Sequence, residues 1–546
     1  MLRYFFFLFL LLLFLVVKAE TLTVCASGCD YVTIEGAVNL AVSGDTIDIQ
    51  AGTFTESDIF IAENLTIRGQ GPTLTIVQAA DRPSAANGRV FFVEGEFTVS
   101  IENLTVRHGV AVGSDNNGGR IQIDCGPLTD VQLVNLIVSD NYAGDEGGGI
   151  HSFGSGGSIS LTNCIISDNE ANGNAPNSLG GGIYHSGAKT FILNRCSIVN
   201  NRAGDDGGGI YSRENSSVLL LTSCTLANNT IGSNNGVNNY GAGIFQRGTA
   251  AALRMINCTV VENSIIGTGE GLGAGVSVRA VGEVTLTNTI ITNNTMVGTA
   301  TTGKDLHLRG TIGALTQTTS LVVDCAAAGA TPCPTFSYTD ATNIASTPST
   351  CGLHTFYDVT GSDAEDNGTP AGGDIPTEDI CGNPRSGNPD IGAIDLTFLP
   401  VDLANFRGQT TYKGNELAWE TVMETNNQGF SVERSTDSRT WKPVGFVAGH
   451  GNSTQWQEYT FLDPRPHPGQ NYYRLRQVDY DGTHTYSNII GLQSNISSTV
   501  EGLVVFPNPT TNSLYYRVTD LPAVQSVQLL DLFGRSVRST FPPQDK

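Results

Sequence analysis

A phrase that recurs between residues 135 and 294 constrains the fold of this chain more than any other feature. Each copy contains a glycine-rich group, an apolar residue, a variable stretch, and then Leu-x-Asn-Cys-x-Ile-x-x-Asn or a close variant. The copies lie 28 to 34 residues apart, so the short words stay fixed while the intervening segments change in length. Such a period is typical of a solenoid, in which each turn packs only on its neighbours. The glycine-rich groups stand at residues 147–149, 180–182, 207–209, 241–243 and 273–275.

Two columns of residues recur in step within this phrase. The first contains leucine, cysteine and threonine, so we interpret its cysteines as small apolar residues with buried thiols. Metal binding is the alternative, but one cysteine per turn cannot surround a tetrahedral ion. The second column is asparagine, expected inside a turn where stacked amides hydrogen-bond to one another and to the backbone. The first column is Leu136, Cys164, Cys196, Cys224, Cys258 and Thr289, and the second is Asn141, Asn169, Asn201, Asn229, Asn263 and Asn294.

Six of the cysteines outside the column are candidates for disulfides. Cys25 and Cys29 flank a short turn that contains glycine, and the remaining four lie in a region without the repeat. In an oxidising compartment these six are expected to form three disulfides, although their pairing does not follow from sequence. The remaining four are Cys325, Cys333, Cys351 and Cys381.

The first 19 residues have the features of a signal peptide. Arg3 precedes an unbroken apolar run over residues 5–17, and Ala19 closes the segment. Thirteen apolar residues are few for a membrane span, so a retained anchor is the less favoured interpretation. The mature protein is therefore expected to be exported, to the extracellular space or the outer cell surface.

The solenoid is expected to begin with a capping helix. Residues 33–41 have helical apolar spacing, and residues 45–49 then alternate as a strand does. A short helix over the first turn would cover a sheet edge that is otherwise open to other chains.

The charge of the chain is strongly acidic and unevenly distributed. The net charge is −23, and residues 20–396 carry 15 Lys+Arg against 38 Asp+Glu. Residues 397–546 carry 12 against 14. Such an excess opposes nucleic acid and anionic polymers as partners, because binding them needs clustered cations. A solvated secreted surface is the simpler interpretation.

The pattern changes near residue 397. All three tryptophans follow it, and short alternating strands appear, as at residues 415–419 and 472–478. Asp437-Ser438 and Asp481-Gly482 supply hairpin turns. Residues 397–496 are therefore predicted to form a β-sandwich.

Three segments resemble known families. Residues 22–396 contain the Gly-Gly-Gly-Ile and Cys-x-Ile-x-x-Asn phrases. Because of these phrases, they resemble right-handed parallel β-helix proteins of bacterial surfaces, of the polymorphic outer-membrane and choice-of-anchor families. Residues 427–435 with 472–475 resemble the fibronectin type III-like domain of Bacteroidota proteins. Residues 505–510 with 527–535 resemble a type A sorting domain of type IX secretion.

These resemblances imply an all-β chain. Its expected parts are a signal peptide (1–19), a right-handed parallel β-helix (20–396), a fibronectin type III-like sandwich (397–496) and a sorting domain (497–546). Sorting domains usually continue for another strand pair, so the last part resembles a truncated one. The resemblance also implies the outer-membrane secretion machinery as a partner of the C-terminal tail.

Catalysis is possible on a β-helix and needs its own test. Among the motifs of polygalacturonase-like enzymes, Asp205-Asp206 is present, and Gly449-His450-Gly451 falls in the predicted sandwich. Lyases need calcium-binding carboxylates beside a basic residue, and residues 20–396 contain only Lys189 and Lys304 as lysines. We therefore assign no catalytic residue and favour a non-catalytic adhesin or surface-binding protein. A polysaccharide-degrading enzyme is the alternative.

The best metal candidates are Asp145-Glu146 and Asp205-Asp206, each directly before a glycine group. Calcium needs six to eight converging oxygens, whereas the intervening turn offers Ser178-Leu179. Solvated turn acids are thus favoured, and no cofactor is assigned, with calcium as the alternative.

The residue after each glycine phrase forms a column of rings. If the preceding apolar residue points inward, this column points outward and is expected to be exposed. Sugars or a protein strand could then stack on it, so we expect glycans or surface proteins of host or neighbouring cells as partners, and no nucleic acid. A self-stacking ladder that stiffens the solenoid is the alternative. The column is His151, Tyr184, Tyr211 and Phe245.

Overall fold

The computed structural model divides the chain into two compact units, Met1–Phe398 and Leu399–Lys546. The structure describes residues 19–494, and also 502–506 and 515–519. Within 19–494 it leaves out residues 83–87, 112–120, 172–177, 188–189, 214, 233–238, 267–270, 298–302, 330, 337, 339–340, 342–343, 346–347, 361, 371–374, 386–387, 396–402, 412, 422–423, 454–455 and 480–483.

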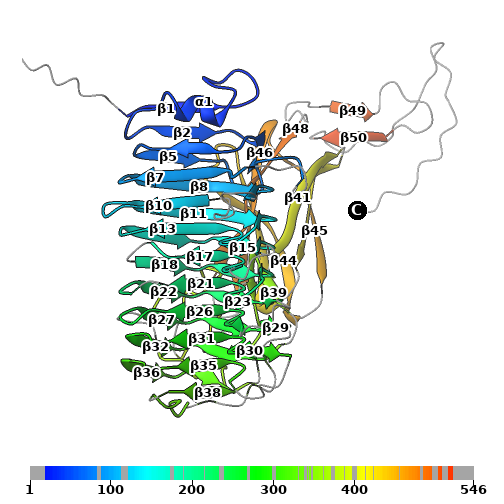
Figure 1. Cartoon of the computed structure of the whole chain (residues 1–546). Helices are drawn as coiled ribbons and strands as arrows, with labels where there is room; N and C mark the ends of the chain where they lie inside the picture. The colour runs from blue at the N-terminus through cyan, green and yellow to red at the C-terminus, as the bar shows by residue number, and fades with distance from the viewer. Residues whose placement is uncertain are drawn as a thin grey trace, which may run out of the picture. The chain divides into compact units, whose positions relative to one another are not determined.

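The first unit is a parallel β-solenoid. Its strands form three long parallel sheets, here called sheets A, B and C, and the layers follow one another in sequence order (Figure 1). The strand pairs within these sheets are parallel and in register, for example β13 with β17 and β17 with β21. The predicted parallel β-helix is therefore confirmed.

The strand bounds are as follows. Sheet A contains β1 (Thr21–Val24), β2 (Thr46–Ile49), β3 (Gly52–Thr55), β5 (Leu65–Arg68), β6 (Thr75–Gln78), β8 (Thr98–Arg107), β11 (Asp130–Ser139), β14 (Ser158–Thr162), β15 (Ile165–Ser167), β18 (Thr190–Asn194), β19 (Ser197–Val199), β22 (Val218–Thr222), β23 (Thr225–Ala227), β27 (Ala252–Ile256), β28 (Thr259–Val261), β32 (Glu283–Thr287), β33 (Ile290–Thr292), β36 (Ala314–Thr318) and β37 (Leu321–Val322). Sheet B contains β4 (Ile59–Ile61), β7 (Phe91–Gly95), β10 (Ile121–Cys125), β13 (Ile150–Gly154), β17 (Ile183–His185), β21 (Ile210–Arg213), β26 (Ile244–Arg247), β31 (Val276–Arg279), β35 (Leu306–Arg309) and β38 (Cys325–Ala328). Sheet C contains β9 (Val110–Ala111), β12 (Tyr142–Ala143), β16 (Glu170–Ala171), β20 (Arg202–Ala203), β24 (Thr230–Ile231), β29 (Ser264–Ile265) and β34 (Thr295–Met296). Two short pairs complete the unit, parallel β25 (Asn239–Tyr240) with β30 (Gly271–Leu272) and antiparallel β39 (Ser349–Cys351) with β40 (His354–Phe356).

The interior of the solenoid follows the alternation of the sequence. Cys164 and Ile166 are both fully buried, as are Cys196 and Ile198 on the next turn, and all four belong to one apolar core. The column cysteines are unbonded thiols, as predicted. Burial raises the pKa of the Cys164 and Cys224 thiols, which keeps them protonated.

The asparagine column forms a continuous amide ladder, as predicted. Each side-chain Nδ2 donates to the Oδ1 of the asparagine one turn on, at 2.7 to 3.0 Å from Asn141 to Asn294. The same Nδ2 atoms also donate to backbone carbonyls, such as that of Val138 from Asn169. The ladder ends where Asn294 donates to the carboxylate of Asp305 at 2.9 Å.

The predicted capping helix is present as α1 (Ile34–Val38). The Thr33 side chain accepts a hydrogen bond from the Gly36 amide at its N-terminus. Ile34, Ala37 and Val38 are buried in the solenoid core, so this helix closes the first turn.

The six candidate cysteines form the three predicted disulfides. They are Cys25–Cys29, Cys325–Cys333 and Cys351–Cys381. Cys125, for which the sequence suggested no role, is a fifth buried free thiol, on β10 of sheet B.

The residues that the structure describes between 338 and 395 cover part of the outer face of sheet A, and we call them the covering segment. His354 lies within hydrogen-bonding distance of Ser197 (3.2 Å) and Asn163 (2.9 Å), and Asn228 donates to the Tyr357 hydroxyl at 3.0 Å. The contact is also apolar, because residues of the segment and of sheet A share a buried cluster. The cluster contains Val199, Ala227, Val261, Ile290, Leu321, Ile344, Tyr357, Val359, Ala364 and Ile391.

The second unit is a β-sandwich, as predicted. One antiparallel sheet contains β41 (Leu403–Thr411), β42 (Gly414–Thr421) and β45 (Gln457–Asp463); the other contains β43 (Glu424–Ser435), β44 (Lys442–Ser453), β46 (Gly469–Asp479), β47 (His484–Tyr486) and β48 (Ile490–Ser494). Side chains of both sheets meet in one core, with Trp419 stacked on Tyr459 and edge-on to Phe430. Strands β49 (Gly502–Phe506) and β50 (Tyr515–Thr519) form a separate antiparallel pair.

Two predictions fall mainly outside the described residues. The predicted signal peptide covers residues 1–19, and most of the predicted sorting segment lies beyond residue 519. Within the part of the chain that the structure describes, no helix has the length and apolar character of a membrane span.

Candidate functional site: the outer face of sheet B

The column of rings predicted as a ligand contact lies on four consecutive strands of sheet B. His151, Tyr184, Tyr211 and Phe245 are register partners on β13, β17, β21 and β26. The rings contact one another along the solenoid with centroid separations of 5.0, 5.3 and 5.6 Å; the first two pairs are stacked and the third is tilted by 58°. The self-stacking ladder, which was the alternative interpretation, is what the structure contains.

The expectation that this column is exposed is wrong. His151 is 3% exposed, and Tyr184, Tyr211 and Phe245 are at most 1% exposed. No sugar can stack on these faces in this conformation.

The column is buried because the segment before each glycine phrase lies against it. The first glycine of each phrase has φ between +62° and +67°, the left-handed bend that glycine adopts without strain. Leu179 and Tyr240, which directly precede such glycines, pack on the rings. At the first turn, Glu146 takes this place, with its carboxylate 3.5 Å from His151 Nε2.

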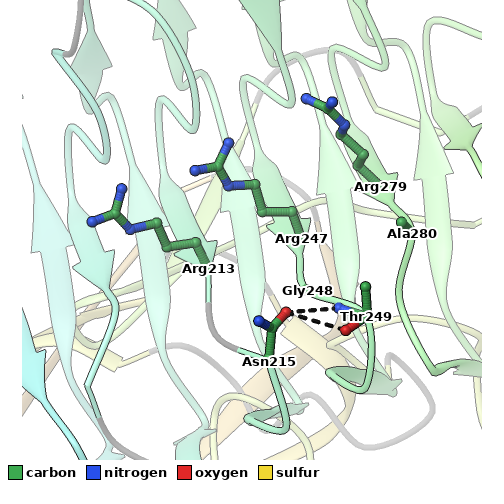
Figure 2. Close-up of a pocket in the computed structure, with 7 residues that line it drawn as sticks. All are labelled: Arg213, Asn215, Arg247, Gly248, Thr249, Arg279 and Ala280. Atoms are coloured by element: carbon green, nitrogen blue, oxygen red, sulfur yellow. Dashed lines mark hydrogen bonds between the residues drawn. The ribbon is translucent and has the colours of Figure 1, made fainter.

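A column of arginines begins two residues after the rings on β21 and β26 and continues on β31 and β35. Arg213, Arg247, Arg279 and Arg309 are register partners on β21, β26, β31 and β35. Strands in register are about 4.8 Å apart, so the four side chains leave the sheet at that interval. Figure 2 shows the first three extending from adjacent strands to the same side. We call these four residues the arginine column.

The arginine column borders a surface pocket of about 350 Å³. Its lining includes Arg213, Arg247 and Arg279 together with turn residues that follow the strands. Asn215 braces two of these turns, because its Oδ1 accepts hydrogen bonds from the amide (3.0 Å) and hydroxyl (3.4 Å) of Thr249 (Figure 2).

Rings of the column below orient Arg213 and Arg247. The guanidinium of Arg213 lies 5.6 Å from the Tyr184 ring centroid, and that of Arg247 lies 5.7 Å from the Tyr211 centroid. Such cation–π contacts orient the guanidinium plane without neutralising its charge. Among the described residues, no carboxylate lies within 4.0 Å of the guanidinium nitrogens of Arg247 or Arg279, the two central members.

The sequence contains a pattern that marks the arginine column, although the prediction of the ring column did not use it. Each arginine stands four residues after the last glycine of its phrase, and in the fourth copy Asp305 replaces that glycine. The four segments are Gly-Ile-Tyr-Ser-Arg (209–213), Gly-Ile-Phe-Gln-Arg (243–247), Gly-Val-Ser-Val-Arg (275–279) and Asp-Leu-His-Leu-Arg (305–309). Four of the 15 basic residues of the β-helix region thus fall in one column. The total charge, which is acidic, gives no indication of it.

The acidic candidates for calcium are separated by the structure. Glu146 is bridged in register to Leu179, and the backbone of Asp206 accepts from Gly180, so a leucine turn lies between the two acidic turns. Asp205 is 4% exposed, and Asp206 Oδ1 accepts the amide of Tyr240 at 2.8 Å. Among the residues that the structure describes, no three His, Cys, Asp or Glu side chains gather as metal ligands would.

Asp206 gives a prediction about pH. Burial raises its pKa to about 7, from 3.8, against the opposing effects of the Tyr240 amide, Arg247 and Arg279. The folded state therefore binds the proton of Asp206 more tightly than the unfolded chain does. The contribution of Asp206 to stability is consequently greatest below pH 4 and is lost as the pH rises through 7. Asp206→Asn is expected to raise the melting temperature above that of the native chain at pH 8 and to leave it nearly unchanged at pH 4.

Melting curves at both pH values check this expectation, with Asp363→Asn on the exposed surface as the control. An equal shift at pH 4 and pH 8 would contradict the assignment of the effect to ionisation of Asp206.

The Gly449-His450-Gly451 motif has a structural role in the second unit. His450 donates its amide to the buried Glu424 carboxylate at 2.7 Å, and its ring lies 2.6 Å from the Tyr459 hydroxyl. Tyr459 also donates to Glu424. These contacts tie β43, β44 and β45 together.

Comparison with known proteins agrees with this architecture. Residues 87–295 match the family model described as right handed beta helix region. The match includes the whole ring column and three of the four arginines. No curated protein matches the chain. The three parallel sheets and the family match together identify the core of this chain as a right-handed parallel β-helix.

Proposed function

We propose that this chain is a non-catalytic surface-binding protein that contacts its partner through the outer face of sheet B. The observation that carries the proposal is the arginine column, four in-register cations in a region with a large acidic excess. A β-helix holds such groups at fixed intervals on rigid strands, which lowers the entropic cost of binding an extended partner.

The surroundings of the acidic pair favour binding over hydrolysis. A general acid or base must reach the bond that it cleaves. Asp205 is buried, and Asp206 engages the backbone of the next turn. Neither presents an open carboxylate of the kind that glycoside hydrolysis needs.

The disulfides favour an extracellular location, because disulfides persist in oxidising compartments. We propose that residues 1–19 direct export and that residues 497–546 act as a type IX sorting tail. The fibronectin type III-like sandwich would then separate the β-helix from the point of release or attachment.

A single experiment separates binding from catalysis. The full chain is applied to immobilised neutral and acidic polysaccharides and to bacterial and host cell surfaces, and the supernatants are assayed for new reducing ends and unsaturated sugars. We expect retention on at least one surface without released products. Product release that Asp206→Asn abolishes would establish the polysaccharide-degrading enzyme instead.

A further inference from the structure

We propose that the arginine column binds a linear anionic glycan that runs along the solenoid axis, with one guanidinium for each carboxylate or sulfate group. This inference rests on the proposed function and names the ligand of its site. It also revises the expectation that anionic polymers are excluded, since that expectation used the total charge of the chain.

The first argument is chemical. A guanidinium has a planar fork of donors that matches two oxygens of a carboxylate or sulfate. All four members of the column are arginine, and residues 20–396 contain only two lysines. Each member of the column can therefore bind one such group through two donors.

The second argument is geometric. The four side chains leave the sheet about 4.8 Å apart, over about 14 Å in total. A polymer with one anionic group on each sugar presents charges at a similar interval along a stiff chain. A nucleic acid duplex instead has one phosphate on each strand per 3.4 Å of helix axis, and its strands wind around that axis, which does not match a straight column.

The third argument is energetic. Like charges on neighbouring strands repel each other, at about 0.9 kcal/mol per pair at this spacing even in bulk water. The column therefore costs stability in the absence of a ligand, and a bound polyanion relieves that cost. The Asp206 carboxylate, which interacts with Arg247 and Arg279, offsets part of this repulsion. More distant acids are screened over about 8 Å at physiological salt and contribute little to the local field.

The fourth argument is preorganisation. Arg213 and Arg247 rest on Tyr184 and Tyr211, and Arg309 donates to the hydroxyl of Tyr240. The side-chain freedom that a ligand would otherwise remove is already reduced, which favours affinity. The buried rings thus support the contact from below.

The test measures binding of the full chain to three size-matched oligosaccharides by calorimetry: a polyuronate, a sulfated glycan and a neutral glucan. The variants are Arg247→Gln and Arg279→Gln, with Arg254→Gln as the matched control. Arg254 is an arginine of sheet A, and its guanidinium already pairs with Glu283 at 2.9 Å. Melting temperatures show whether each variant is folded.

We expect one or both anionic oligosaccharides to bind and the neutral one to fail. Each column variant should weaken binding at least about tenfold, while Arg254→Gln changes it less than about twofold. Arg279→Lys keeps the charge but loses the fork, so it should weaken binding by an intermediate factor. Affinity should fall as salt is raised, and the ligand should raise the melting temperature.

The polyuronate and sulfated arms identify which anionic group is preferred. Equal losses in the control and column variants, or tighter binding of a single-stranded oligonucleotide of equal charge, would overturn the inference. If the chain bound only the neutral glucan, or bound a cell surface, and the column variants did not change that binding, the inference about the anionic glycan would be overturned. The proposed function would still stand. Absence of binding to every probe would overturn both.

Discussion

Asn201→Ala is expected to lower the free energy of unfolding of the solenoid by about 3–5 kcal/mol. The Oδ1 of Asn201 accepts from the amide and the side chain of Asn169, at 3.1 and 3.0 Å. Its Nδ2 donates to Ile166, Val199 and Asn229. Alanine removes all five contacts at a site with no solvent exposure, so buried donors and acceptors on three turns lose a partner.

The matched control is Asn194→Ala, at a partly exposed position on β18, with an expected change within about 0.5 kcal/mol. Denaturant unfolding followed by circular dichroism measures both variants. Tryptophan fluorescence would report the wrong unit, because all three tryptophans lie after residue 398. A loss below 1 kcal/mol for Asn201→Ala would mean that the ladder contributes little to stability.

Gly180→Ala is the second change with a large expected effect, about 2–4 kcal/mol. Gly180 has φ of +67°, and a Cβ placed there would lie 2.4 Å from the carbonyl oxygen of Ile183 and 2.9 Å from the Cα of Tyr184. The bend would have to open, which would move Leu179 away from the ring column.

Gly352→Ala isolates the conformational part of this effect. Gly352 has a similar φ of +57°, but a Cβ there meets no atom within 4 Å, so only the left-handed conformation is penalised, by about 1 kcal/mol. The same unfolding measurement compares the two variants. If they lose equal stability, the close approach at Gly180 has no cost.

The repeat predicted the solenoid because a column residue has the same neighbours on every turn. The cysteine core, the asparagine ladder and the capping helix followed from periodicity alone. The burial of Tyr184 did not follow from periodicity, because strand alternation predicts which face of the sheet a side chain occupies but not which other residues cover that face. The covering segment was also missed, since residues 338–395 carry no repeat.

The arginine column was missed for a different reason. Its residues have a fixed spacing from the glycine phrase, so the information is local. The net charge of residues 20–396 was considered as a single total, and the many acidic residues in that total outweigh the four aligned arginines. In solenoids, charge is informative when it is counted column by column.

The covering segment has a consequence for how this solenoid can evolve. Repeat arrays usually gain or lose whole units, because each unit contacts only its neighbours. Here one segment bonds to Asn163, Ser197, Asn228 and Asn288, which lie on separate turns. Inserting one repeat among them would displace the later contacts by about 4.8 Å, beyond the reach of a hydrogen bond. The segment therefore fixes the number of turns between Asn163 and Asn288, so that this part of the array has a set length.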